Sequence, residues 1–453
     1  MESTCVAPSV PLSTALLRRF DVPGPRYTSY PTADRFVEAF DAEQLQGALR
    51  QRAEGAQIGG PGPLSIYVHV PFCASVCYYC ACNKIITRHH ERAAPFLDAL
   101  ELEVDLYAEA LGSGQPVSQL HLGGGSPTFL DDGELKRLLG ALRRSFRLQP
   151  AAELSIEVDP RTVDDSRLAA LREMGFNRLS FGVQDFDPQV QAAVHRIQPY
   201  EQVAALMASA RALGFESINA DLIYGLPRQT TASVARTLGQ VIELAPDRIA
   251  LYAYAHLPQR FKPQRRINIV ELPRAGDRVA MLEDAIQQFL GAGYVYIGMD
   301  HFARPDDALA IAKRQGRLHR NFQGYSTQPD CDLIGLGPSA IGRIGATYNQ
   351  NAKQLQDWYD ALHQRQLPVE RGLALTRDDL LRRAVIMALM CQGRLEFEDI
   401  EQTHLVRVRE YFAHELARLE EFAAAGLVEF EDGAVQVTAA GWYVVRAIAM
   451  QFD

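Results

Sequence analysis

The stretch Ser65-Ile-Tyr-Val-His-Val-Pro-Phe-Cys73-Ala-Ser-Val-Cys77-Tyr-Tyr-Cys80-Ala-Cys82 is the most informative part of this chain. Its apolar, β-branched start over residues 65–71 predicts a buried strand, and cysteines spaced C-x-x-x-C-x-x-C follow directly. Three thiolates cannot saturate a cubic iron–sulfur cluster, so one iron would stay open for a substrate or cofactor. The alternatives at this point are a structural zinc site or a cluster closed by all four thiols.

Composition and charge are those of an ordinary globular chain. The 453 residues, 47% hydrophobic and 22% charged, suffice for two or three domains or for one barrel with attachments. A net charge of −9 argues against broad binding to nucleic acid or anionic membrane. We find no apolar stretch long enough to span a bilayer and no signal peptide. Cys5, Cys331 and Cys391 are scattered, which suits a reducing cytoplasm rather than a disulfide framework.

Short apolar runs alternate with helical patterns from about residue 64 onward. The predicted strands are 65–71, 118–123, 153–158, 178–183, 217–223, 248–254 and 294–298. The predicted helices between them are 92–111, 132–146, 163–174, 200–213, 230–244 and 275–291. This alternation predicts right-handed βαβ units and a parallel sheet in an α/β fold. Six or more such units curl into a full or partial barrel.

Polar and glycine residues gather where these strands end. They are Cys73–Cys82, Gly123-Gly-Gly-Ser126, Glu157 with Asp159, Gln184 with Asp185, Asp221, and Ala255-His256. In a parallel α/β barrel this edge builds the active site. Carboxylates such as Glu157 and Asp221 can accept hydrogen bonds from ribose hydroxyls or an ammonium group, although each could also cap a helix. The glycine loop could equally be a tight turn.

We predict three domains. Residues 1–62 form an N-terminal extension that ends at the linker Gly59-Gly-Pro-Gly62. Residues 63–370 form the barrel and its extension, and residues 371–453 form a mostly helical, winged-helix-like domain. In the last domain we expect a helix capped at Thr376, a helix over 405–425, a hairpin over 427–438 turning at Asp432-Gly433, and a final helix from Ala439.

The cysteine spacing after a first barrel strand resembles that of the radical S-adenosylmethionine (SAM) enzymes. The resemblance implies a [4Fe-4S] cluster held by Cys73, Cys77 and Cys80, with SAM on the open iron. It also implies a radical SAM partial (β/α)6 TIM-like barrel. Tyr79 fits the aromatic residue that this superfamily usually has before the third cysteine.

A closer resemblance, covering nearly the whole chain, links it to the oxygen-independent coproporphyrinogen III oxidases, also called coproporphyrinogen dehydrogenases. It is carried by Gly24-Pro-Arg-Tyr-Thr-Ser-Tyr-Pro-Thr-Ala33, Cys80-Ala-Cys-Asn-Lys84, Gly123-Gly-Gly-Ser-Pro-Thr128, Ser155-Ile-Glu-Val-Asp-Pro160, Gly182-Val-Gln-Asp-Phe186, Asp221-Leu-Ile-Tyr-Gly-Leu-Pro227, Tyr254-Ala-His-Leu-Pro258, Gly298-Met-Asp-His-Phe-Ala-Arg304 and His319-Arg-Asn-Phe-Gln-Gly-Tyr325.

Matching family positions imply two SAM molecules. The first would be bound by Tyr67, Gly124, Glu157 and Ile341, and the second by Tyr79, Gly125, Ser126, Gln184, Arg196, Asp221 and Ala255. Ser126 stands where the family more often has threonine, and Tyr79 where phenylalanine is common. We interpret Cys82 as functional but not as a cluster ligand. The catalytic residues we predict are Cys82, Glu157 and Tyr79.

The implied function is oxidative decarboxylation of two coproporphyrinogen III propionates to the vinyl groups of protoporphyrinogen IX in heme biosynthesis, by a SAM-derived 5′-deoxyadenosyl radical. We expect a cytoplasmic monomer with an external one-electron donor such as a flavodoxin, and neither nucleic acid nor membrane as a partner. The cations predicted to face the propionates are Arg26 first, then Lys262, Arg265, Arg266 and Arg320.

The alternative function is that of a heme-binding or heme-delivery relative on the same scaffold, without dehydrogenase activity. That branch usually has an aromatic residue in place of Cys82 and lacks the segment 24–31, so both features favour the oxidase.

Overall fold

The computed structural model describes residues 19–20, 24–55, 62–328 and 330–453. The predicted linker lies outside these residues except for Gly62. In the described part of the chain, no helix combines the length and the apolar character needed to cross a membrane.

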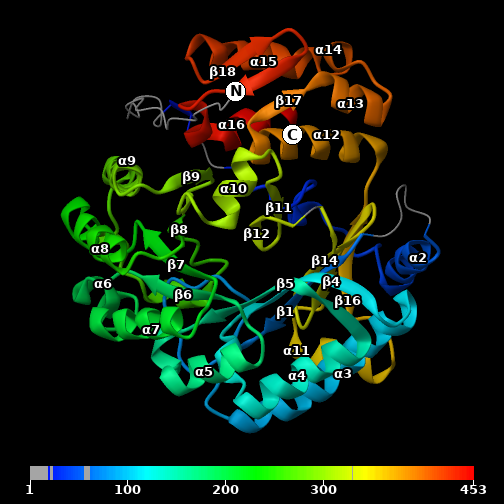
Figure 1. Cartoon of the computed structure of the whole chain (residues 1–453), viewed down its shortest axis with the longest axis vertical. Helices are drawn as coiled ribbons and strands as arrows, with labels where there is room; N and C mark the ends of the chain where they lie inside the picture. The colour runs from blue at the N-terminus through cyan, green and yellow to red at the C-terminus, as the bar shows by residue number, and fades with distance from the viewer. Residues whose placement is uncertain (1–18, 21–23, 56–61, 329) are drawn as a thin grey trace.

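One large sheet forms the centre of the molecule (Figure 1). Its six consecutive parallel strands are β1 (Leu64–Val70), β4 (Gln115–Gly124), β5 (Phe146–Val158), β6 (Arg178–Gln184), β7 (Ser217–Tyr224) and β8 (Arg248–Ala253). The six strands predicted from 65–71 to 248–254 are therefore confirmed. The sheet continues beyond β1 with β13 (Asp332–Leu336), β14 (Ile341–Ile344), β15 (Thr347–Asn351) and β16 (Val369–Ala374), and beyond β8 with β10 (His301–Ala303) and β9 (Val295–Gly298). Because β16 and β9 stand at opposite ends of the sheet and do not pair with each other, the barrel is partial, as predicted.

The edges of the sheet differ from the sequence prediction. The strand predicted at 294–298 exists as β9, but it runs antiparallel to β10 and does not continue the parallel series. On the other edge, β13 is parallel to β1 and is followed by three antiparallel strands that the apolar pattern did not reveal.

Helices cover the outer side of the sheet (Figure 1). They are α3 (Ala93–Leu111), α4 (Asp132–Ser145), α5 (Asp165–Glu173), α6 (Pro188–Ala193), α7 (Tyr200–Ala212), α8 (Thr231–Leu244) and α9 (Ala275–Gly291). Two of them begin with reciprocal caps, at Asp131 for α4 and Thr230 for α8, which satisfy the first free amides of each helix. Three further helices are α2 (Ala42–Ala53), α10 (Ala308–Arg314) and α11 (Leu355–His363).

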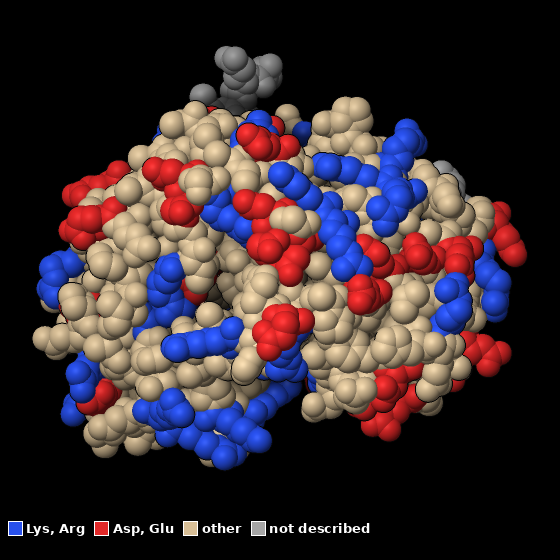
Figure 2. All heavy atoms as spheres, turned by 90° about the horizontal axis from the view of Figure 1, so that it is seen from below, with Lys and Arg blue, Asp and Glu red and all other residues tan. Residues whose placement is uncertain are grey.

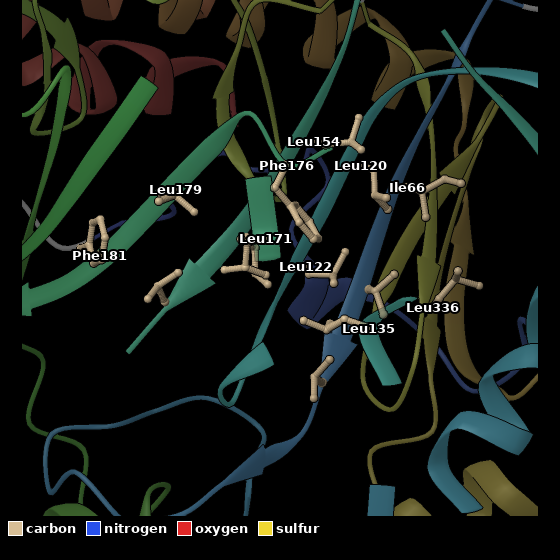
Figure 3. Close-up of a cluster of buried hydrophobic side chains, with 14 of the residues drawn as sticks. Ile66, Leu120, Leu122, Leu135, Leu154, Leu171, Phe176, Leu179, Phe181 and Leu336 are labelled. Atoms are coloured by element: carbon tan, nitrogen blue, oxygen red, sulfur yellow. The ribbon is translucent and has the colours of Figure 1, made fainter. Parts of the chain in front are cut away.

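Along each parallel strand, side chains that point into the apolar core alternate with side chains that point to the functional face of the sheet. Side chains such as Leu120, Leu122 and Leu179 point outward, where Leu135 of α4 and Leu171 of α5 cover them (Figure 3). Successive strand residues point to opposite faces, so the polar residues between these leucines line the inside of the barrel. Burial of this apolar layer stabilises the fold at about 25 cal/mol per Å² and fixes the register of the polar face.

The C-terminal part packs across the open side of the sheet (Figure 1). It consists of α12 (Arg377–Met387), α13 (Phe397–His404), α14 (Val408–Tyr411), α15 (Ala413–Ala424), α16 (Val445–Ala449) and a small sheet of β17 (Arg394–Glu396), β18 (Val428–Glu431) and β19 (Ala434–Val437). The Thr376 cap and the hairpin are confirmed. The single helix predicted over 405–425 is wrong, because its residues form two helices, α14 and α15, which are separated at Phe412 by a non-helical backbone with φ −104° and ψ 26°. The predicted last helix begins with 3-10 turns at Gly441–Val444, and its α-helical part is α16.

The N-terminal segment 24–31 joins the barrel to this C-terminal part. The Tyr27 hydroxyl donates to Asp453 Oδ2 at 3.0 Å, and Tyr27 and Tyr30 belong to the same buried cluster as Phe412 and Phe452. The segment 24–31 and the C-terminal residues of the described chain are therefore packed together. The domain boundaries at 62/63 and 370/371 stay a proposal.

Charge is spread unevenly over the surface. Figure 2 shows one face on which basic side chains gather in some places and acidic ones in others. The net charge of −9 therefore does not describe the local field at any one face.

Candidate active site

The cysteines sit on a loop tied down at both ends. The short strands β2 (Phe72–Cys73) and β3 (Ile85–Ile86) pair in parallel and hold the base of the loop. Lys84 Nζ donates to the carbonyls of Cys80 and Cys82 at 3.3 and 3.2 Å, which fixes the far end. The loop therefore presents its thiols to one cavity of about 360 Å³, lined by Cys73, Cys77, Cys80 and Cys82.

Two arginines reach the thiol of Cys77. Arg196 donates to Cys77 Sγ at 3.5 Å and Arg161 at 3.6 Å. Asp159 Oδ2 accepts from both, at 2.6 Å from Arg161 and 3.4 Å from Arg196. Burial raises the pKa of Asp159, but its hydrogen bonds from Arg161 and the charge of Arg196 outweigh burial and lower it. The two guanidinium groups therefore place positive charge beside the sulfur of Cys77.

Cys82 differs from the other cysteines in its hydrogen bonding. A bond from the Cys82 thiol is the main cause that lowers the pKa of Cys80 to about 6, and the same bond raises the pKa of Cys82. By contrast, burial and the neighbouring thiols raise the pKa of Cys73 to about 12. The thiols of Cys80 and Cys82 therefore lie within hydrogen-bond reach of each other, and the role of Cys82 stays a prediction.

The donor set fits an iron–sulfur cluster better than a single ion. Tetrahedral zinc, with Zn–S bonds of about 2.3 Å, holds its sulfurs about 3.8 Å apart. Among the described residues, the group of three donors whose ligand atoms all lie within 4.8 Å of one another is His90, Asp131 and Glu134, not the cysteines. No three cysteine sulfurs in the described part of the chain therefore all lie within 4.8 Å of one another, which is a wider spread than a single zinc ion needs.

The glycine loop after β4 rests directly on the base of the cysteine loop. Gly125 N donates to Val70 O at 2.8 Å and Ser126 N to Phe72 O at 2.9 Å. A Cβ at Gly125 would lie 2.8 Å from Phe72 O, so only glycine allows this approach. Gly124, with φ +116°, donates its amide to Glu157 Oε2 at 3.2 Å.

Two carboxylates face the cavity from the strands on either side of β6, Glu157 from β5 and Asp221 from β7. Asp221 accepts from Ser180 Oγ at 2.7 Å and from Asn219 Nδ2 at 3.0 Å. Burial raises the pKa of Asp221 to about 6, and the charge of Glu157 adds to this. His121 Nε2 lies 3.5 Å from Glu157 Oε1, while its Nδ1 contacts Ser155 Oγ at 2.6 Å.

Strand β6 ends in an unusual conformation that orients two further predicted residues. Gln184 adopts φ +66° at the strand end. Arg196 NH2 donates to Gly182 O at 2.6 Å, which holds the guanidinium against the strand. Tyr79 lies beside Arg196, and burial raises its pKa well above the ordinary value.

Most of the predicted site residues meet in this one place. The smaller cavity is lined by Cys73, Cys77, Tyr79, Cys80, Cys82, Gly124, Gly125, Ser126, Glu157, Gln184, Arg196 and Asp221. A second cavity of about 570 Å³ adjoins it and shares Tyr79, Cys80, Cys82, Glu157, Ser180, Gln184 and Asp221 with it.

Three predicted residues lie apart from the rest. Ala255 lines only the larger cavity. Tyr67 and Ile341 line neither cavity. The Tyr67 ring stacks on His121 at 5.9 Å, next to Glu157, whereas Ile341 lies on β14 against Gly335. The structure thus does not bring Ile341 to the cavity.

Sequence reasoning missed several side chains of the site. Arg161 had no signal beyond its place two residues after Asp159. His121, Ser180 and Asn219 each alternate with buried strand residues, so the period of two could have placed them on the inner face.

Comparison with known proteins first defines the class. Residues 67–241 match the family model of the radical SAM superfamily, and residues 375–444 match that of the HemN C-terminal domain. The curved parallel sheet and the three-cysteine loop are thus those of a radical SAM enzyme, a class that uses a [4Fe-4S] cluster and SAM.

Relatives of nearly equal length then define the family. The oxygen-independent coproporphyrinogen III oxidase of Pseudomonas aeruginosa is 49% identical over 440 residues, 97% of this chain and 95% of its own. The Escherichia coli protein of that name is 48% identical, over 97% of this chain and 94% of its own. The solved structure of E. coli coproporphyrinogen III oxidase (HemN), described as a radical SAM enzyme, superimposes with a TM-score of 0.92 at 47% identity, covering 97% of this chain and 98% of that one. The chain belongs to the oxygen-independent coproporphyrinogen III oxidase family, which confirms the resemblance found in the sequence.

Proposed function

We propose that this protein converts coproporphyrinogen III to protoporphyrinogen IX without oxygen, as a step of heme biosynthesis. Each of two propionates loses a hydrogen atom from its β-carbon, one carbon dioxide and one electron, leaving a vinyl group. When bound, the cluster and SAM supply the carbon radical that removes this hydrogen atom. The observation that carries the proposal is the three-thiol loop at the junction of two cavities in a chain related to these oxidases over nearly its full length.

The side chains of this chain bind and orient the reacting groups. Cys73, Cys77 and Cys80 would hold the cluster, while Arg161 and Arg196 stabilise negative charge on its sulfurs through their contacts with Cys77. The aligned amides and carboxylates around Gly124 and Glu157 suit a ligand with ammonium and carboxylate groups.

Two adjoining cavities support the binding of two SAM molecules. Of the residues assigned to the second SAM, Tyr79, Gln184 and Asp221 line both cavities, whereas Gly125, Ser126 and Arg196 line only the smaller one. Ala255 lines the larger cavity alone. We infer that one SAM lies on the cluster side and the other toward the larger cavity, where the porphyrinogen also binds.

Two arginines next to the larger cavity suit the carboxylates of the substrate. Arg320 is buried, its Nε donates to Arg26 O at 3.0 Å, and its NH1 has no hydrogen-bond partner among the described residues. Arg26 lies 5.2 Å over the ring of Tyr252 and Arg320 lies 4.5 Å over that of Tyr325, and both rings line the cavity. A buried guanidinium with a free N–H stabilises an incoming carboxylate strongly. Of the five cations predicted to face propionates, these two contact rings that line the cavity, while the assignment of Lys262, Arg265 and Arg266, which are exposed, stays a prediction.

Heme delivery, the alternative function, receives less support. The segment 24–31 is built into the wall near Tyr252 and is held by Asp453, so it has a structural place beside the cavity. We keep a cytoplasmic monomer with an external one-electron donor such as a flavodoxin as part of the proposal.

An anaerobic assay tests the function. Purified protein with reductant, SAM and coproporphyrinogen III should yield protoporphyrinogen IX and two molecules of carbon dioxide per substrate. The Cys73→Ser variant should lack the absorbance of the cluster and all turnover. Stable binding of heme together with no vinyl product would favour the delivery protein instead.

A further inference from the structure

A basic loop, defined here as residues 256–274, covers the outside of the cysteine loop. Arg260, Lys262, Arg265, Arg266 and Arg274 are exposed on it, and its one acidic residue is Glu271. Glu271 Oε1 accepts from Arg228 at 2.9 Å, so its charge is already balanced. In a chain with a net charge of −9, this loop is a local region of positive charge.

The basic loop contacts the cysteine loop directly. Gln264 is buried, and its Nε2 donates to the carbonyl of Tyr79 at 3.0 Å, while its Oε1 accepts from Leu257 N at 2.6 Å. Tyr79 lies between two of the cluster cysteines, Cys77 and Cys80. The region of positive charge is thus held next to the metal site rather than on a distant surface.

A column of three stacked side chains runs from the cysteine loop to the surface. The Tyr78 ring, adjacent to Cys77, stacks on the exposed His195 ring with centroids 5.1 Å apart and planes at 9°. The Arg266 guanidinium lies 5.3 Å from the centroid of the Tyr78 ring. Backbone bonds fix the column, because Tyr78 N donates to Val194 O at 2.9 Å and His195 Nδ1 contacts Val76 O at 2.8 Å.

Exposed apolar side chains flank this column. Ile197 follows His195 and is 59% exposed, while Ile269 and Val270 of the basic loop are 67% and 83% exposed. Single exposed apolar residues need no explanation, but these three lie on the two segments that carry the column. A few apolar contacts inside a charged rim are the composition of a small, transient protein interface.

We propose that this face is the docking surface for an acidic, one-electron carrier protein. The inference rests on the proposed function, which needs an electron for every radical that is formed. In the docked complex the carrier is oxidised by one electron and the metal centre behind Tyr78 is reduced by one. Opposite charges speed the encounter and orient the carrier, and the small interface lets it leave after transfer.

Binding and turnover test the proposal separately, with a flavodoxin as the acidic probe. The double variant Arg265→Glu/Arg266→Glu should bind flavodoxin roughly tenfold more weakly than the wild type at low salt, and the wild type should lose affinity as salt increases. Flavodoxin-supported turnover should fall by a similar factor. Dithionite needs no docking, so the ratio of flavodoxin-supported to dithionite-supported turnover should fall by the same factor. A second double variant, Arg260→Glu/Lys262→Glu, should act in the same direction.

A matched control reverses a charge elsewhere. Arg236, on α8, is 68% exposed and pairs with Asp187, so Arg236→Glu should leave flavodoxin binding and both activities as in the wild type. Unchanged flavodoxin binding by both double variants would overturn the proposal. The proposal would also be overturned if the double variants lost turnover equally with flavodoxin and with dithionite and showed a raised KM for coproporphyrinogen III. The basic loop would then steer the anionic substrate. Failure of the wild type to turn over with dithionite would count against the proposed function, and the binding titration would still decide the docking site.

Discussion

Replacing Asp221 by Asn should make the ligand-free protein more stable while impairing its function. Burial raises the pKa of this carboxyl from 3.8 to about 6, so keeping it ionised at pH 7 disfavours the folded state. A shift of about 2 units at 1.36 kcal/mol per unit amounts to about 3 kcal/mol. An asparagine can keep both hydrogen bonds, accepting from Asn219 and donating to the hydroxyl of Ser180, which currently donates to Asp221.

Thermal unfolding at several pH values measures this effect. At about 2.1 cal/mol/K per residue, unfolding 453 residues has an entropy near 0.95 kcal/mol/K, so 3 kcal/mol corresponds to a rise of about 3 °C in Tm at pH 7. Because the folded state binds the proton more tightly, the penalty is absent below pH 3.8 and grows as the pH rises toward 6. The difference between Asp221→Asn and wild type should therefore shrink to roughly half at pH 5.

The control is the exposed Asp306, whose side chain is 78% accessible. Asp306→Asn removes the same charge and should change stability by no more than about 0.5 kcal/mol. The reasoning is refuted if Asp221→Asn lowers Tm at pH 7, or if its gain is the same at pH 5 and pH 7. Anaerobic SAM binding, measured on the same samples, should be weaker in Asp221→Asn, because the neutral amide accepts less strongly from hydroxyl or ammonium groups.

Three further predictions concern the site. Cys82→Ser should keep the iron content of the wild type but lose most product formation, and loss of iron in that variant would show that Cys82 is a ligand. Gly125→Ala should lower the free energy of unfolding by about 1–3 kcal/mol and reduce cluster assembly, because the added Cβ would meet a backbone oxygen at 2.8 Å. The control is Gly239→Ala, which should have neither effect because nothing lies within 4 Å of the added Cβ. Equal behaviour of the two variants would contradict the packing argument. Arg26→Gln should raise the KM for coproporphyrinogen III roughly tenfold with little change in kcat, and an unchanged KM would remove Arg26 from the substrate site.

The parallel part of the fold could be predicted because the pattern there is local. Each of the six parallel strands, β1 and β4 to β8, alternates or runs apolar over several residues, and polar or glycine residues lie at or just after its end. The ends of parallel strands share one edge, so Gly124, Glu157, Gln184 and Asp221 could be grouped before the structure was known. The structure brings these four residues to one cavity.

The remaining features depend on contacts between distant segments. Strands β13 to β16 are short and mixed in polarity, and only pairing with β1 makes β13 part of the sheet. The segment around Arg26 and Tyr27 meets Arg320 and Asp453, residues about 300 and 400 positions away, and no local pattern encodes such contacts. Ile341 was assigned by resemblance alone; it lines neither cavity, and its part in binding stays a prediction.

The smaller cavity combines several arrangements that cost stability in the free chain. Asp221 is a buried acid, Gln184 holds a left-handed backbone conformation, and Arg196 Nε has no hydrogen-bond partner among the described residues. These three residues line the same cavity, although the core leucines behind them are well packed. A ligand that offers hydroxyl and ammonium donors to the acid and an acceptor to the arginine would offset these costs on binding. The cost in stability is therefore a consequence of a preorganised binding site. Polar groups that lack partners in the free protein are available to hold the ligand in one orientation.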